Sequence, residues 1–89
     1  MRKDWLKRKL TIEQAEAENM VTDERLGQAP VPFGYCNNMW RALLAKMRSG
    51  DELWEFSSSR ESWQHLCGRR GIALVRGGEV VASVLTEMN

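Results

Sequence analysis

Residue types that usually carry catalysis or bind metals are scarce in this chain. It has one histidine, His65, and two cysteines, Cys36 and Cys67, among 89 residues. The cysteines lie far apart and outside the spacing of paired ligands, so we interpret them as free thiols in a reducing compartment. On a helix, His65 and Cys67 would point about 200° apart and could not chelate one metal together. The sequence therefore predicts no metal site and no cofactor.

Long apolar runs and long basic tracts are missing as well. No stretch approaches the ~20 apolar residues that span a bilayer. Lys7, Arg8 and Lys9 also interrupt the apolar segment that a signal peptide would need. We therefore expect a cytoplasmic protein without membrane contact. The formal net charge of +1 gives no overall argument for nucleic-acid binding.

The composition is that of an ordinary globular chain, with 43% hydrophobic and 28% charged residues. Its length predicts a single small domain, 1–89, which buries only about 60–65% of the surface of its unfolded chain. Proteins with such a small core are commonly stabilised by self-association. Four tryptophans are many for this length, which also indicates a surface that meets a partner.

Residues 1–26 are predicted to be a helical N-terminal segment, basic in the first ten residues and acidic after them. Thr11 and Gln14 match a capping box, which predicts a helix that begins near Ile12. Alternatively, one helix runs from about residue 5 to residue 25. Its apolar stripe is weak, so we expect it to pack loosely or to need a second chain.

A connector that contains both prolines is predicted at residues 27–36, because proline excludes helix and favours an extended path. The strongest helical pattern of the chain follows, beginning at Asn37 or Asn38 and ending at Gly50. Its apolar residues recur at the helical spacing: Trp40, Leu43, Leu44 and Met47.

Residues 52–56 alternate between two faces and predict a strand. Ser58 and Glu61 then match a second capping box, which predicts a short helix that Gly68 ends. We expect the apolar stripe of this helix to pack against the sheet. That stripe consists of Trp63, Leu66 and Cys67.

Residues 71–76 and 79–85 are two β-rich runs separated by Gly77 and Gly78, which predicts a hairpin with a type I′ or II′ turn. This turn sets Arg76 opposite Glu79. One face then carries Ile72, Leu74, Val81 and Leu85, and the other carries Ala73, Val75, Val80, Ala82 and Val84. The predicted fold is α+β: N-terminal helices followed by β-α-β-β with a three-stranded antiparallel sheet, in which residues 37–89 form a helix plus the β-α-β-β core.

Both faces of this predicted sheet are apolar, so each needs a cover. The helices that carry Trp40 and Trp63 cover one face, whereas the N-terminal helix has too thin an apolar stripe to cover the other. A second copy of the chain, bound through a two-fold interface, is the simplest cover. The candidate interaction residues are Trp5, Ile72, Leu74, Val81 and Leu85.

Catalytic interpretations are weaker than structural ones. Cys36 and His65 are the residue types of a nucleophile and its base, but a buried thiol and a solvated histidine explain them more simply. Glu52, Glu55 and Glu61 are candidates for paired carboxylates, although Glu61 already has a capping role. We therefore predict no catalytic residue.

Basic residues offer an alternative function, contact with nucleic acid or another anion. The candidates are Arg2, Lys3, Lys7, Arg8, Lys9, Arg69 and Arg70. The last two lie in a Gly-Arg-Arg-Gly segment that follows a predicted helix end, where the helix dipole repels anions. Arginines that cap the last carbonyls explain that segment more simply.

Several segments resemble a group of small bacterial proteins with no assigned activity: FGY, WRALL, GDELWEF, ESW, GRRGIALVR and the terminal MN. The resemblance covers residues 32–89 and implies no functional residue. Because both predicted sheet faces are apolar and the four tryptophans exceed what a small core needs, we expect a non-enzymatic protein-interaction module that forms a homodimer. A nucleic-acid-associated protein is the alternative, and a small enzyme without a recognisable motif comes third.

Overall fold

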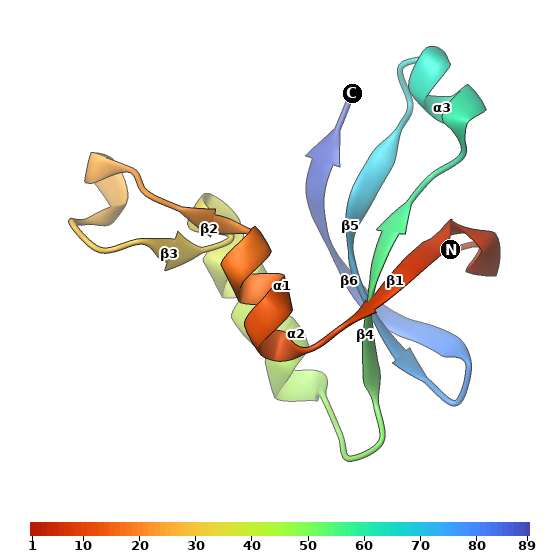
Figure 1. The fold of residues 1–89 in the computed structure, drawn as a ribbon, viewed down its shortest axis with the longest axis horizontal. Coiled ribbons are helices and arrows are strands. Elements are labelled where there is room, and N and C mark those ends of the chain that lie inside the picture. Colours follow the sequence, from red (N-terminus) through yellow and green to blue (C-terminus); the bar gives the residue numbers. More distant parts are fainter.

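Four antiparallel strands form the main sheet of the computed structural model, which describes residues 1–89 (Figure 1). Their order is β1-β4-β5-β6, with bounds β1 (Leu6–Leu10), β4 (Glu52–Ser57), β5 (Arg69–Arg76) and β6 (Glu79–Met88). A two-stranded sheet, β2 (Met20–Val21) and β3 (Val31–Pro32), extends to one side as an arm. The helices are α1 (Ile12–Glu18), α2 (Asn37–Lys46) and α3 (Arg60–Gln64), with single 3₁₀ turns at η1 (Lys3–Trp5), η2 (Glu24–Leu26) and η3 (Gly34–Cys36). The α+β class is confirmed, but the main sheet has four strands rather than the predicted three.

The additional strand is β1, in a segment that we predicted to be helical. It pairs with β4, so that Leu10 lies opposite Leu53 and Leu6 lies opposite Phe56. Between these apolar pairs, Arg8 lies opposite Glu55. Apolar and charged partners across the strands stabilise the extended conformation. This pairing with residues far along the chain overrides local helix propensity, and the single helix over residues 5–25 is wrong.

The helix that begins at Ile12 is confirmed. The backbone N–H of Gln14 donates to Thr11 Oγ1 over 3.0 Å, and the N–H of Thr11 donates to Gln14 Oε1 over 2.9 Å. This capping box satisfies two amides that have no partner inside the helix. α1 is short, however, and ends at Glu18.

Helices α1 and α2 both cover the same face of the main sheet, which we call the helix-covered face (Figure 1). Trp40 on α2 stacks on Phe33 with 4.4 Å between ring centroids, and its Nε1 donates to Glu16 on α1 over 2.9 Å. The predicted apolar stripe of α2 thus lies in the core, although the helix ends at Lys46 rather than at Gly50. The buried residues of this core are Leu10, Ala15, Phe33, Trp40, Leu43, Leu53, Ile72, Leu74 and Val84.

The opposite face of the sheet carries a smaller apolar cluster. Phe56, Ala73 and Val75 are buried there. The residues packed against them are Trp5, Leu6, Trp54 and Val80. The prediction that the chain leaves one whole sheet face uncovered is therefore wrong, because α1 joins α2 on one face and the η1 turn covers part of the other.

The β5–β6 hairpin has the predicted turn but a different register. Gly77 and Gly78 have φ values of 57° and 83°, as a type I′ turn requires, and Arg76 lies opposite Glu79. Beyond Val80, however, a β-bulge inserts Val81, so Leu74 lies opposite Ala82. A second irregularity leaves Thr86 without a partner.

These bulges change which side chains share a face, because one extra residue reverses the alternation. Val84 lies opposite Ile72 and is buried on the helix-covered face, contrary to our prediction. Val81 and Leu85, predicted to join Ile72 and Leu74, are instead 43% and 38% exposed.

Helix α3 is capped by Ser59 rather than Ser58, and it packs no side chain into either core. Leu66 is 75% exposed and has a left-handed backbone (φ 58°), so it takes the terminating role that we predicted for Gly68. The stripe of Trp63, Leu66 and Cys67 is therefore wrong. Trp63 instead covers Gly68, whose added Cβ would lie 2.1 Å from the indole ring.

Candidate interaction surface

Strand β6 forms a free edge of the main sheet. It has ten residues and pairs only with β5, so the backbone groups on its outer side have no partner strand. Edge strands of natural proteins are usually protected by lysine, proline or short length. β6 has no lysine, arginine or proline, and its charged residues are confined to positions 79 and 87 near its ends. Its two bulges are the only protective feature of this kind.

The side chains along this edge are apolar and accessible. Three large hydrophobic side chains of this strand are exposed: Val81, Leu85 and Met88. Ser83 is also exposed, whereas Val84, which lies between Ser83 and Leu85, is buried. The edge thus combines unpaired backbone groups with apolar side chains, the two features that favour addition of another strand.

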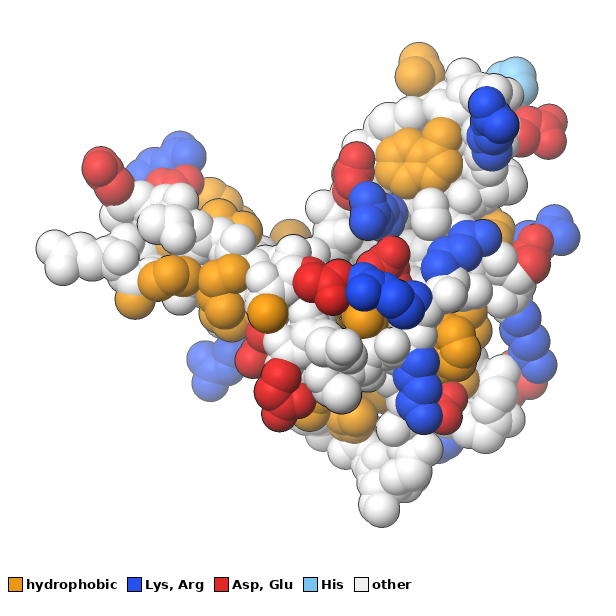
Figure 2. Space-filling view, viewed as in Figure 1, with side chains coloured by type: hydrophobic (Ala, Val, Ile, Leu, Met, Phe, Trp, Pro, Cys, Tyr) orange, Lys and Arg blue, Asp and Glu red, His pale blue; other side chains and the backbone are white.

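An apolar cleft adjoins the edge on the side of the arm formed by β2 and β3. Its volume is about 280 Å³. Figure 2 shows apolar side chains along this arm and a hollow between the arm and the strands. The cleft is lined by Glu18, Asn19, Met20, Val21, Phe33, Cys36, Leu85 and Thr86. An apolar side chain of a segment bound next to β6 would therefore contact the apolar residues of this cleft.

The arm is held in place by local interactions. The side chain of Asn19 donates to the carbonyl of Ala15 over 2.8 Å, and the backbone N–H of Phe33 donates to the carbonyl of Asn19 over 2.8 Å. Gly34 has φ 54°, and a Cβ there would approach Val21 to 3.1 Å. Glycine thus allows η3 to pass close beneath the arm.

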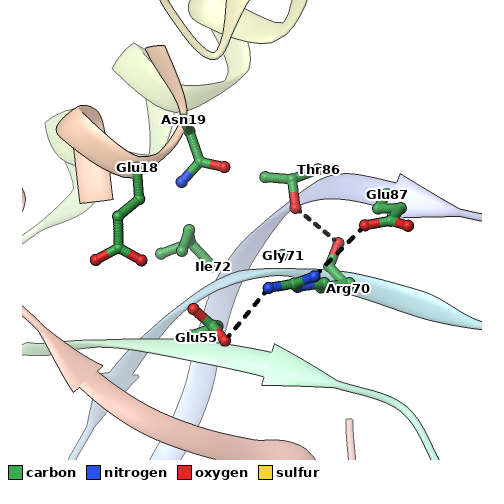
Figure 3. Close-up of a pocket in the computed structure, with 8 residues that line it drawn as sticks. All are labelled: Glu18, Asn19, Glu55, Arg70, Gly71, Ile72, Thr86 and Glu87. Carbon is green, nitrogen blue, oxygen red and sulfur yellow. Dashed lines mark hydrogen bonds and ion pairs between the residues drawn. The ribbon is translucent and has the colours of Figure 1, made fainter. Parts of the chain in front are cut away.

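A second cavity, of about 250 Å³, is polar and lies on the helix-covered face where β5 begins and β6 ends (Figure 3). Its charged lining residues are Glu18, Glu55, Arg70 and Glu87. Together with Arg8 of β1, which pairs with both Glu18 and Glu55, they form a chain of ion pairs from α1 across all four strands. Arg70 lies 3.7 Å from Glu55 and 3.6 Å from Glu87. Hydrogen bonds to Glu18 and then Glu55 raise the pKa of the Arg8 guanidinium above its ordinary range. Because every carboxylate here has an arginine partner, we interpret the cavity as a structural ion-pair chain.

The predicted carboxylate candidates are not brought together. Glu55 belongs to the ion-pair chain, whereas Glu52 accepts one hydrogen bond from Trp54 Nε1 and forms an ion pair with Lys9, each over 3.0 Å. These two contacts, the one from Trp54 first, lower the pKa of the Glu52 carboxyl. Glu61 lies on α3, away from both.

The cysteines and the histidine do not form a site either. Cys36 is half-buried against the helix-covered core, whereas His65 and Cys67 are exposed just after α3. No group of three or more His, Cys, Asp or Glu residues is arranged to hold a metal ion.

None of the helices has both the length and the apolar character that a membrane span requires.

The basic residues predicted to contact anions are mostly paired with carboxylates. Arg2 lies 3.1 Å from Asp4, and Lys3 lies 3.3 Å from Glu79. Lys9, Arg8 and Arg70 have the partners described above. Lys7 donates only to a backbone carbonyl, that of Asp4. Arg69 donates to the carbonyl of Gly68 over 2.8 Å. This carbonyl lies beyond the end of α3 at Gln64, so the prediction that these arginines cap the last helix carbonyls is wrong.

The predicted interaction residues divide into two groups. Ile72 and Leu74 are 2% and 0% exposed inside the helix-covered core, so they line no accessible surface. Trp5 is half-buried in the opposite cluster. Val81 and Leu85 remain, and they lie on the edge strand. Sequence reasoning missed Met20, Val21 and Met88, since a short arm and a strand that continues to residue 88 carry weak local signals.

Comparisons of the chain with models of protein families, with curated proteins and with solved structures found no match. The resemblance of residues 32–89 to small bacterial proteins therefore stays an expectation from the sequence. The functional argument depends on the geometry of the edge and the cleft.

Proposed function

We propose that the protein is a non-enzymatic interaction module that binds another polypeptide as an added strand along the outer edge of β6. One observation carries this proposal: β6 is a ten-residue edge strand whose central residues include no charge and no proline. An added strand would satisfy the unpaired backbone groups, and backbone hydrogen bonds would contribute affinity independently of side chains.

The cleft beside the edge would add specificity. In this binding mode, alternate side chains of the added strand point to one side and occupy neighbouring pockets. The cleft walls include Met20, Val21 and Leu85, which favour an aliphatic side chain at that position. The partner would therefore be an extended, β-branched and aliphatic segment rather than a charged one.

The pairing of the basic residues counts against the nucleic-acid alternative. Binding to phosphates depends on arginine and lysine side chains that can replace counterions. Here Arg2, Lys3, Arg8, Lys9 and Arg70 each have a carboxylate within 4 Å. We also place the protein in the cytoplasm, a proposal supported by its two free thiols.

Selection from a displayed library of random ten-residue peptides tests the module directly. We expect the immobilised protein to select peptides rich in valine, isoleucine and threonine. Binding should be lost in the variant Leu85→Lys, which places a charge on the edge, and kept in Leu66→Lys, which changes a more exposed leucine beyond α3. Failure of the monomeric protein to select any such peptide, or equal loss in both variants, would refute the proposal.

A further inference from the structure

We propose that the strand accepted by the edge of β6 is β6 of a second copy of this chain, paired antiparallel about Ser83. This inference rests on the proposed function and names the partner. The observation behind it is a near-palindrome. Residues 79–87 read Glu-Val-Val-Ala-Ser-Val-Leu-Thr-Glu, so equal steps outward from Ser83 meet residues of similar kind.

The near-palindrome matches each residue with a suitable partner when two strands run antiparallel about Ser83. Ala82 then lies opposite Val84 of the second copy, and Val81 lies opposite Leu85. Val80 lies opposite Thr86, which has the same β-branched shape. Cross-strand pairs of β-branched and aliphatic residues stabilise sheets. The two exposed apolar residues, Val81 and Leu85, would cover each other twice in one dimer.

The register also preserves the two faces of the sheet. Ala82 and Val84 lie opposite Leu74 and Ile72, so both point to the helix-covered face, whereas Ser83 lies opposite Ala73 and points to the other. For residues 82–84, which lie between the two bulges, pairing about Ser83 places residues of the same face opposite each other. The two sheets would then join into one sheet of eight strands with the helices of both copies on the same side.

Neighbouring registers are poorer. If the two-fold axis passed through Val84, Val81 would lie opposite Glu87. If it passed through Ala82, Leu85 would lie opposite Glu79. Each shift places a charge opposite an exposed aliphatic residue. The sequence of β6 therefore selects Ser83 as the centre.

The pairing about Ser83 brings Glu79 opposite Glu87 at both ends, but each carboxylate already has a cation in its own chain. Lys3 Nζ lies 3.3 Å from Glu79 Oε1, and Arg70 Nη1 lies 3.6 Å from Glu87 Oε2. The four carboxylates would thus meet four basic residues. The ends of the interface are electrically balanced, so moderate salt should not dissociate the dimer.

Other surfaces are less suitable for self-association. The other edge of the sheet, β1, has five residues, of which Lys7, Arg8 and Lys9 are basic, and lysine protects edges against pairing. The helix-covered face is closed by α1 and α2, and the opposite face is partly covered by Trp5 and Leu6. The long edge that remains is β6, which has no lysine or proline and is protected only by its two bulges.

A charge exchange tests the partner and the register together. By multi-angle light scattering at ~100 µM, we expect the wild-type chain to have about twice its mass of 10.2 kDa. Val81→Lys alone and Leu85→Glu alone should each give a monomer. The double variant should restore the dimer, because opposite charges would then face each other at both positions. Leu66→Lys serves as the control and should remain dimeric.

Disulfide trapping gives a second readout that does not depend on dissociation. At the two-fold axis the Cα atoms of the two Ser83 residues would lie ~4.5–5.5 Å apart, within the range for a disulfide. In a background with Cys36→Ala and Cys67→Ser, we expect Ser83→Cys to form a covalent dimer on mild oxidation. Thr86→Cys, several residues from the axis, should not.

The outcomes separate the two proposals. A wild-type monomer that still selects strand-like peptides overturns the second-copy inference and leaves the interaction module intact. A monomer that selects none overturns both. A dimer that survives both single substitutions, or that fails to return in the double variant and does not form the Ser83→Cys disulfide, overturns the pairing about Ser83.

Discussion

Arg76 holds Asp51 through two parallel hydrogen bonds, from Nε to Oδ1 over 2.9 Å and from Nη2 to Oδ2 over 2.8 Å. Arg76 also donates to the carbonyl of Lys46 over 3.0 Å, and Asp51 accepts from the backbone N–H of Arg48 over 2.9 Å. The side chain of Asp51 is only 2% exposed. The pair therefore joins the end of α2, the turn before β4 and the end of β5.

This pair predicts a pH dependence of stability. The hydrogen bonds from Arg76, and then that from Arg48, lower the pKa of Asp51 from 3.8 to about 2. Since the folded pKa lies below the unfolded one, the stabilisation is fully present above about pH 4 and is lost as pH falls towards 2. Asp51→Asn should lower the urea midpoint at pH 6, and the difference from wild type should shrink by pH 2.5. Asp4→Asn, at an exposed ion pair, should change little at either pH.

Trp63 is half-buried and lies outside both apolar cores, so its truncation should cost less than that of a core aromatic residue. We expect Trp63→Ala to lower the free energy of unfolding by ~1–2 kcal/mol, against ~3–5 kcal/mol for Phe56→Ala, because Phe56 is 1% exposed. Urea unfolding of both variants measures the difference. Equal losses would indicate that α3 packs more tightly on the sheet than its exposure suggests.

The contact between Trp63 and Gly68 predicts a coupling between these two positions. An alanine Cβ at Gly68 would lie 2.1 Å from the Trp63 indole, so Gly68→Ala should displace the ring and destabilise the protein. In a Trp63→Ala background the same substitution should cost much less. A double-mutant cycle should therefore give a coupling of ~1 kcal/mol or more, and additive effects would contradict the contact.

The hairpin turn predicts a clear difference between two substitutions to valine. Gly77 has φ 57°, where a β-branched residue is strained, whereas Ser83 lies in an extended strand and is exposed. We expect Gly77→Val to cost ~1–2 kcal/mol or more and Ser83→Val to be close to neutral for the folding of each chain. Thermal unfolding checks this, and equal shifts of the midpoint would exclude the two-residue turn.

Features with a local physical cause could be predicted from the sequence. The capping box at Thr11 and the turn at Gly77 and Gly78 depend on residues that are neighbours in the chain. The apolar stripe of α2 follows from helical spacing alone. The start of α1 and the turn are where they were predicted, whereas α2 ends at Lys46, before the predicted Gly50.

Features that depend on distant parts of the chain could not be predicted in this way. β1 is a strand because it pairs with residues about 45 positions later, and its own basic residues carry no β signal. The bulge at Val81 has no glycine or proline to mark it, yet it moved Val84 into the core and Leu85 to the surface. The bulge therefore also determines which side chains form the interaction surface. The sequence identified Val81 and Leu85 as interaction residues, but it predicted them on a sheet face rather than along a free edge.

The position of β1 in the sheet has a consequence for folding kinetics. β4, β5 and β6 follow one another in the chain and can associate through short loops, whereas β1 must close a loop of more than forty residues to reach β4. We therefore expect β1 to join after the rate-limiting step. Its contacts, such as that of Leu10 with the core, would then slow unfolding while leaving the folding rate nearly unchanged. The lifetime of the native state, rather than the speed of its formation, would depend on this first strand.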